Sequence, residues 1–264
     1  MPENETRMPI TAHLAELRKR LLNTVVALFV GFLVCFQFSQ PLLTWLRLPL
    51  TFTLNFDQVF PYAHPGSIKS PATLIFTEPA EAFWMYMKIG FIAGIFLALP
   101  FVFTQVWLFI SPGLLPKERR YALPFVISAT VLFILGALFC QYFLLPFAIQ
   151  FLLTYQTEGL VPMISVGKYV DFVSKFLLAS GLIFELPLII LVLSKLGIVT
   201  PQFLAKQRKY AILLAFIAAA ILTPTPDMFN QTLMAMPIIV LYEVGIIVAR
   251  LFGRKKEVAS DNQG

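Results

Sequence analysis

Charge is scarce in this sequence. Only 13% of its 264 residues are Asp, Glu, Lys or Arg, whereas 58% are hydrophobic, and the mean hydropathy is +0.81. A soluble globular domain carries about 25% charged and about 45–50% apolar residues. So few charges do not cover a surface that faces water, and the composition therefore predicts an integral membrane protein of the all-α class.

Residues for a disulfide framework or a metal centre are also few. The chain has two cysteines and two histidines, widely separated in the sequence. That number and spacing exclude a disulfide scaffold and a zinc site. The sequence also has no Walker loop, no Gly-x-Ser-x-Gly motif, no His-Glu-x-x-His motif and no dinucleotide fingerprint. We therefore expect neither an enzyme nor a bound cofactor.

Six apolar segments are candidates for membrane-spanning helices. A helix needs about 20 apolar residues to cross the hydrocarbon layer. The first apolar run is too long for a cleaved signal peptide and is expected to remain as an anchor, and the fifth is short for a span. The two halves of the chain show no internal repeat. The predicted spans are approximately 21–38, 83–110, 121–145, 169–193, 210–222 and 229–251.

The basic residues predict the orientation of these spans. Of the 20 Lys and Arg residues, 15 fall in the N-terminal segment, in the loops after the second and fourth spans, and in the C-terminal tail. Because basic residues gather on the cytoplasmic side, both termini are predicted to be cytoplasmic. The chain is then one membrane domain, 1–264, with an amphipathic cytoplasmic helix at 9–22 and a cytoplasmic tail at 252–264. The long, apolar outer loops are expected to form short helices that cap the outer side.

Glu185 is the most unusual polar residue, because it lies midway along the fourth predicted span. An ionisable group at that depth costs about 2.5–3.5 kcal/mol on insertion scales. It is a protonated carboxyl group bonded inside the bundle, a carboxyl group in a water-filled dent, or a polar docking point for a partner helix that has its own polar residue. Pro187 removes a backbone donor and predicts a bend beside it.

Two acidic residues stand among the basic groups of the predicted cytoplasmic face, Glu16 and Glu118. They have an ordinary explanation: Glu16 pairs with Arg20 at i,i+4, and Glu118 lies in the first turn of a helix, where the helix dipole favours it. They also have a functional one, since two carboxylates can receive a cationic peptide motif through bidentate hydrogen bonds.

Several motifs in combination resemble the TatC family, the multi-spanning subunit of the twin-arginine protein translocase. They are HLAELRKRL at 13–21, QVWLFISPGL at 105–114 with KERR at 117–120, FELP at 184–187, and TPTPD at 223–227. The resemblance covers roughly residues 10–250. It implies a subunit of the bacterial inner membrane that recognises paired-arginine signal peptides of folded precursors and assembles single-span TatA- and TatB-type subunits. Transport would be driven by the proton-motive force.

The resemblance also implies roles for individual residues. Contacts with further copies of the chain and with membrane lipid are expected, and none with nucleic acid. By their positions in the motifs, the signal-peptide residues are Glu16, Arg18, Phe109 and Glu118, the partner-helix residues are Glu185, Gln231 and Asp227, and the outer-loop residue is Pro49.

Two other functions were weighed from the sequence. A small-solute or proton-coupled transporter could use Glu185 as its carrier group, but it predicts a second buried ionisable residue and an internal repeat. The sequence offers neither clearly. A structural anchor for a peripheral enzyme predicts that Glu185→Ala is tolerated.

Overall fold

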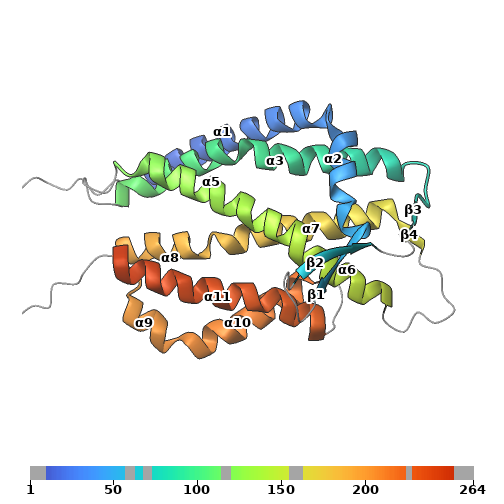
Figure 1. The fold of residues 1–264 in the computed structure, drawn as a ribbon. Helices are drawn as coiled ribbons and strands as arrows, with labels where there is room; N and C mark the ends of the chain where they lie inside the picture. Colours follow the sequence, from blue (N-terminus) through green and yellow to red (C-terminus); the bar gives the residue numbers. More distant parts are fainter. Residues whose placement is uncertain are drawn as a thin grey trace, which may run out of the picture. The chain divides into compact units, whose positions relative to one another are not determined.

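The computed structural model describes residues 10–56, 63–67, 73–113, 120–154, 163–223 and 228–252 (Figure 1). The chain divides into two compact units, Met1–Leu178 and Ala179–Gly264, and the division falls within helix α7. The described residues of both units are mainly helical. The elements that begin in the first unit are α1 (Ile10–Phe36), α2 (Ser39–Leu46), the 3₁₀ turn η1 (Leu48–Leu50), β1 (Phe52–Phe56), β2 (Ala63–Ser67), β3 (Thr73–Ile75), α3 (Glu81–Ile110), the 3₁₀ turn η2 (Ser111–Gly113), α5 (Ala122–Phe139), the π turn η3 (Cys140–Leu144), α6 (Leu145–Thr154), β4 (Met163–Ser165) and α7 (Val166–Phe184). Those of the second unit are α8 (Leu186–Lys195), α9 (Pro201–Lys206), α10 (Arg208–Leu222) and α11 (Met228–Phe252).

Five helical stretches in the described part of the chain are long and apolar enough to cross a membrane. They correspond to five of the six predicted spans and cover Leu14–Phe36, Glu81–Ile110, Ala122–Leu153, Val166–Lys195 and Met228–Phe252. The other predicted span, 210–222, lies in α10, which has 15 residues. Such a helix rises about 22 Å, which is less than the hydrocarbon thickness of about 30 Å. The count of six spans therefore remains a prediction.

Helix α1 contains both the predicted amphipathic segment and the first predicted span. It runs without a break for 27 residues. Between Pro9 and Gly31 the sequence has no proline or glycine, so nothing interrupts the backbone hydrogen bonds where the polar segment meets the apolar one. The N-terminal segment is therefore a direct continuation of the span.

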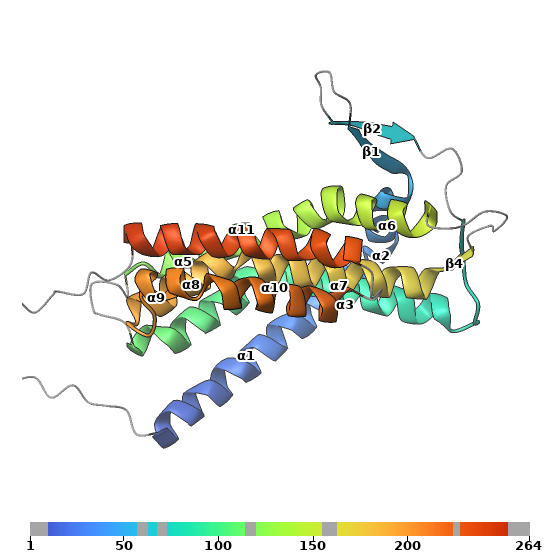
Figure 2. The ribbon, with the colours of Figure 1, turned by 90° about the horizontal axis from the view of Figure 1, so that it is seen from below.

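Close backbone contact joins α1 to α3. A Cβ atom added to Gly31 would lie 2.6 Å from the carbonyl oxygen of Gly94, and one added to Gly94 would lie 2.5 Å from the backbone nitrogen of Phe32. Gly90, one turn before Gly94, likewise faces Phe36. Small residues spaced four apart allow helix backbones to approach closely. The two helices therefore cross at these glycines, and the N-terminal end of α1 diverges from α3 (Figure 2).

The third predicted span is longer than the sequence indicated. The predicted span 121–145 is followed by further helix without a break, because α5, η3 and α6 form a continuous helical stretch to Thr154. In η3 the amide of Leu145 donates to the carbonyl of Cys140, five residues back. This wider π turn places Pro146 in the first turn of α6, where its missing N–H disturbs the helix least.

Between α1 and α3 the described residues form the short helix α2, the turn η1 and the strands β1, β2 and β3. Strands β1 and β2 pair antiparallel from Phe52–Ser67 to Phe56–Ala63, and β3 pairs parallel with β4. The helix α2 and the turn η1 lie where short helices were predicted. The strands were not predicted, because a run of three to five residues is too short to show a clear alternation of apolar and polar residues. That these elements cap the outer side remains a prediction.

Hydrogen bonds hold the C-terminal end of α2 in place. The amide nitrogen of Gln141 donates to the carbonyl of Trp45 at 2.8 Å, and the hydroxyl of Tyr169 donates to the carbonyl of Leu46 at 2.7 Å. Pro49 follows in the turn η1, where it is fully buried. Its fixed φ suits that turn, so Pro49 shapes the way the chain leaves α2.

Two polar contacts join α3 to the start of α7. The carboxylate of Glu81 accepts hydrogen bonds from the backbone amide of Gly167 at 2.7 Å and from the hydroxyl of Ser165. One helical turn further along, the ammonium group of Lys88 lies 2.6 Å from the carboxylate of Asp171. In the first unit, α3 therefore packs against α1 at the glycines and is joined to the start of α7 by these polar contacts.

In the second unit the sequence determines where the helices begin and end. Glu185 lies between α7 and α8, with Pro187 in the first turn of α8, and the bend predicted beside it remains a prediction. Helix α8 ends at Lys195 and is followed by Gly197, whose φ of 76° is favoured by glycine. The hydroxyl of Thr200 accepts from the amide of Phe203 and caps α9. Helix α8 packs against α11, where Ile190 contacts the α-carbon region of Gly245.

Candidate functional site

A polar cluster joins the N-terminal part of α1 to the C-terminal part of α3. One guanidinium nitrogen of Arg20, Nη2, lies 3.2 Å from Oε1 of Glu16. The other terminal nitrogen, Nη1, donates to Oε1 of Gln105 at 3.4 Å. We call Glu16, Arg20 and Gln105 the α1–α3 polar cluster. The Glu16–Arg20 pair predicted from the i,i+4 spacing is confirmed, and Gln105 extends it to a second helix.

The carboxylate of Glu16 is held by only one of its two oxygens. Among the described residues, Oε2 of Glu16 receives no hydrogen bond. The side chains of Glu16 and Arg20 are 22% and 24% exposed, so both remain accessible from outside the helix pair. A carboxylate oxygen that is accessible and unbonded can accept two further hydrogen bonds from a cation.

Arg20 is also incompletely bonded. Its Nε is buried and has no hydrogen-bond partner in the part of the chain that the structure describes. Gln105 is only 6% exposed and fixed on α3, so the contact with Gln105 draws the arginine toward the interior. Arg20 therefore shares its donors between two acceptors and satisfies neither fully.

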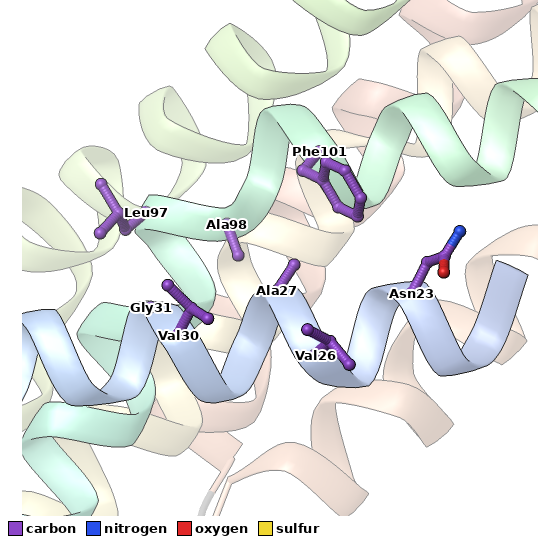
Figure 3. Close-up of a pocket in the computed structure, with 8 residues that line it drawn as sticks. All are labelled: Asn23, Val26, Ala27, Val30, Gly31, Leu97, Ala98 and Phe101. Carbon is purple, nitrogen blue, oxygen red and sulfur yellow. The ribbon is translucent and has the colours of Figure 1, made fainter.

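An apolar groove leads from this cluster along the crossing of α1 and α3 (Figure 3). It has a volume of about 480 Å³. Asn23 and Ala27 point from α1 toward α3, and Ala98 and Phe101 point from α3 toward α1. The groove is lined by Asn23, Val26, Ala27, Val30, Gly31, Leu97, Ala98 and Phe101.

The spacing of these residues shows why the cluster and the groove are continuous. On α1, positions 16, 20, 23 and 27 recur every three or four residues and share one face. On α3, Phe101 precedes Gln105 by one turn, so the two share a face as well. The polar cluster therefore stands at one end of the groove, and the close contact at Gly31 and Gly94 closes the other.

The other predicted signal-peptide residues have different outcomes. Arg18 is exposed on α1, and Phe109 is partly buried in the last turn of α3, one turn beyond Gln105. Glu118 lies outside the described residues, so its position relative to Glu16 remains a prediction. Arg20, Gln105 and Asn23 were not predicted as site residues. The sequence does contain a signal for them: Arg20 and Asn23 follow Glu16 at helical spacing, and Gln105 precedes Phe109 by one turn. Such regularly spaced polar side chains are unusual in an otherwise apolar segment.

In the second unit, Glu185 is 4% exposed, and its Oε1 has no hydrogen-bond partner among the described residues. It is the only Asp, Glu, Lys or Arg that is buried among the side chains the structure describes. An unbonded buried carboxyl group lowers stability unless a partner satisfies it.

Of the remaining predicted partner-helix residues, Gln231 lies in α11. The amide nitrogen of Gln231 donates to the carbonyl of Phe216 at 3.1 Å and thereby joins α11 to α10. Asp227 lies outside the described residues. Within the described ranges, no three His, Cys, Asp or Glu side chains gather closely enough to hold a metal ion.

Comparisons with known proteins give consistent results. A family described as "Sec-independent protein translocase protein (TatC)" matches residues 12–237. A protein of that name from Desulforapulum autotrophicum is 40% identical over 97% of this chain and 90% of its own length, and one from Magnetococcus marinus is 41% identical over 96% and 88%. A crystal structure described as the twin arginine translocase receptor TatC superposes with a TM-score of 0.76 at 35% identity, covering 92% of this chain and all of the other.

Proposed function

Since the chain belongs to the TatC family of Sec-independent protein translocase proteins, we propose that it receives paired-arginine signal peptides and assembles the partner subunits of the translocase. Its relatives are named as translocase components, and the chain is accordingly a membrane protein of protein transport and not an enzyme.

The proposed setting is the bacterial inner membrane, crossed six times, with both termini in the cytoplasm. The distribution of basic residues supports this orientation, since 15 of 20 lie on the proposed cytoplasmic side. It puts the α1–α3 polar cluster at the cytoplasmic surface, where a newly made precursor first meets the membrane.

One observation carries the proposal: an accessible carboxylate, Glu16, lies on the same face of α1 as Asn23 and Ala27, which line the apolar groove. A twin-arginine signal has the complementary order, a cationic motif followed by an apolar run. The guanidinium group of one arginine would bind Glu16, and the apolar run would follow the groove toward Ala27 and Ala98. Glu118 is proposed to receive the second arginine, with Arg18 and Phe109 beside the bound peptide.

The expected affinity is modest. A hydrogen bond to a charged group contributes about 1.5–3 kcal/mol, and less where water screens the pair. Burial of the apolar run adds to this in proportion to its area. A sum of this size suits a receptor that must release its cargo.

Cross-linking tests the proposed site. A photoreactive residue is placed at Phe109, and a labelled precursor with a paired-arginine signal is added to membranes containing the full chain. We expect a cross-link that is lost when both arginines are replaced by lysine. As a matched position, Leu251 is exposed on α11 at the same proposed side, and no cross-link is expected from it. Equal yields from Phe109 with both precursors would contradict the proposal.

Glu185 is proposed to meet a polar side chain of a single-span TatA- or TatB-type helix, with Asp227 and Gln231 near the same surface and further copies of the chain completing the assembly. Its unbonded oxygen supports this role, because a partner's donor would satisfy it. A relay of protons through the chain has less support, since no second buried Asp, Glu, Lys or Arg accompanies Glu185 among the described side chains.

Glu185→Ala is therefore expected to reduce co-purification of the single-span subunit about 5-fold or more, since one buried hydrogen bond is lost. The variant should accumulate to the level of the original chain, because it also removes an unbonded oxygen. Glu185→Gln keeps a hydrogen-bonding group of the same shape and should retain most of the partner. Unchanged co-purification of Glu185→Ala would exclude the contact and favour a purely structural role.

A further inference from the structure

We propose that Arg20 is an internal competitor for the signal peptide: it occupies Glu16 in the empty receptor and must be displaced when a guanidinium group of the signal binds. This inference rests on the proposed function and adds to it a residue that sets specificity. It follows from three features of the α1–α3 polar cluster, namely the quality of the Glu16–Arg20 contact, the second acceptor within reach of Arg20, and the access to Glu16.

The Glu16–Arg20 contact is poor for an arginine–carboxylate pair. It consists of one contact, Nη2 to Oε1, at 3.2 Å. Charge-assisted hydrogen bonds normally measure about 2.7–2.9 Å and, for arginine, often form in parallel pairs. The second unit contains such a pair, in which Nε and Nη2 of Arg208 donate to the two oxygens of Glu243 at 2.7 and 2.8 Å. The same chain therefore makes a good pair in one place and an incomplete one at the proposed site.

Arg20 has a second hydrogen-bond acceptor within reach when it leaves Glu16. Its Nη1 already lies 3.4 Å from Oε1 of Gln105, and its buried Nε has no partner among the described residues. Rotation toward α3 would shorten the contact with Gln105. The displaced arginine therefore keeps a hydrogen bond, and the exchange does not leave a buried charge without a partner.

The exchange favours arginine over lysine in the signal. A guanidinium group can bind both oxygens of Glu16 at once, which exceeds the single contact it replaces. A lysine ammonium group makes a single point contact, of the kind that Arg20 already makes with Glu16. Replacing Arg20 by such a lysine therefore gains little binding free energy. Arg20 thus increases the binding strength that an incoming cation needs in order to displace it from Glu16.

The experiment measures the affinity of the full chain, in lipid nanodiscs, for a fluorescent synthetic peptide with two adjacent arginines and an apolar run. Arg20→Gln is expected to tighten binding about two- to fivefold, because no competing ion pair has to be broken. Arg20→Lys restores a charge beside Glu16 and should return the affinity toward the original value. Lys19→Gln is the matched control, since it removes the same charge from an exposed neighbour in the same turn and should give a smaller gain.

The decisive comparison is made in the Glu16→Gln background. In that background Arg20→Gln should increase the affinity no more than Lys19→Gln does, because the carboxylate for which Arg20 competes is absent. Affinity that is unchanged or weaker for Arg20→Gln, or an equal gain with and without Glu16, would overturn the inference. If Glu16→Gln alone binds as tightly as the original chain, the proposed function fails instead, so the two failures are distinguishable.

Gln105→Leu provides a second variant that does not depend on the folding of Arg20→Gln. It removes the acceptor to which the displaced arginine turns, and binding should weaken about twofold or more. Undiminished binding by Gln105→Leu would also count against the inference. Thermal unfolding of each variant in the same nanodiscs shows that the affinities compare folded proteins.

Discussion

Replacing Glu16 by lysine is expected to abolish signal-peptide binding and export. The change removes one charge-assisted hydrogen bond, which contributes about 1.5–3 kcal/mol, and it places a like charge where the arginine would bind. The affinity for a paired-arginine peptide should therefore fall about 100-fold or more. The measurement is the dissociation constant of the labelled peptide, together with export of a reporter precursor in cells that carry only the variant chain.

Glu78→Lys is the matched control for this prediction. It reverses an exposed acidic charge near the start of α3, at the end of that helix opposite Gln105, and no role in signal binding is proposed for it. Its affinity should remain within about twofold of the original, as is usual for surface substitutions away from a site. If Glu16→Lys binds the peptide as Glu78→Lys does, the carboxylate at position 16 is not the receptor for the arginine.

Gly94→Ala is expected to separate α1 from α3. The added Cβ atom would lie 2.5 Å from the backbone nitrogen of Phe32 and 2.8 Å from the carbonyl carbon of Gly31. Because these are backbone atoms, no side-chain rotation relieves the overlap, and one helix has to move. Overpacking of this kind destabilises by about 1–3 kcal/mol. We expect a lower melting temperature of the purified chain and weaker peptide binding, since the groove depends on this crossing.

Ala93→Val serves as the control for added volume on the same helix. Ala93 lines an apolar cavity of about 610 Å³ bounded by α1, α2, α3, α5 and α7, so two more methyl groups there have room. Its melting temperature should stay close to that of the original chain. Equal stability of Gly94→Ala and Ala93→Val would show that the glycines do not set the distance between α1 and α3.

Hydrophobicity alone located most of the helices, because a chain in lipid must present long apolar runs and satisfy its backbone hydrogen bonds within each helix. Prediction from hydrophobicity failed where the backbone hydrogen bonds are satisfied by something other than a regular α-helix. The third span was predicted to extend to about residue 145, but the π turn before Pro146 lets the helix continue beyond it. The strands β3 and β4 pair across some 90 positions in the sequence, and such pairing leaves little local pattern.

The candidate site was only partly predictable for a similar reason. Glu16 was visible as an acidic residue among basic ones, and its i,i+4 pairing with Arg20 follows from helix geometry. The contact between Arg20 and Gln105 joins residues 85 positions apart. It depends on the crossing of two helices at Gly31 and Gly94, and no local pattern in the sequence specifies that crossing. The end of α7 beside Glu185 agrees with the position of Pro187, whereas the partner proposed for Glu185 would belong to another chain.

The central claim is that a signal-peptide arginine pairs with Glu16, and a double-mutant cycle between the two tests it most directly. The full chain and its Glu16→Gln variant are each titrated with a paired-arginine peptide and with peptides in which one arginine at a time is glutamine. The account predicts a coupling free energy of about 1 kcal/mol or more between Glu16 and one of the two arginines. A coupling of zero for both arginines, with binding to the original chain intact, would contradict it.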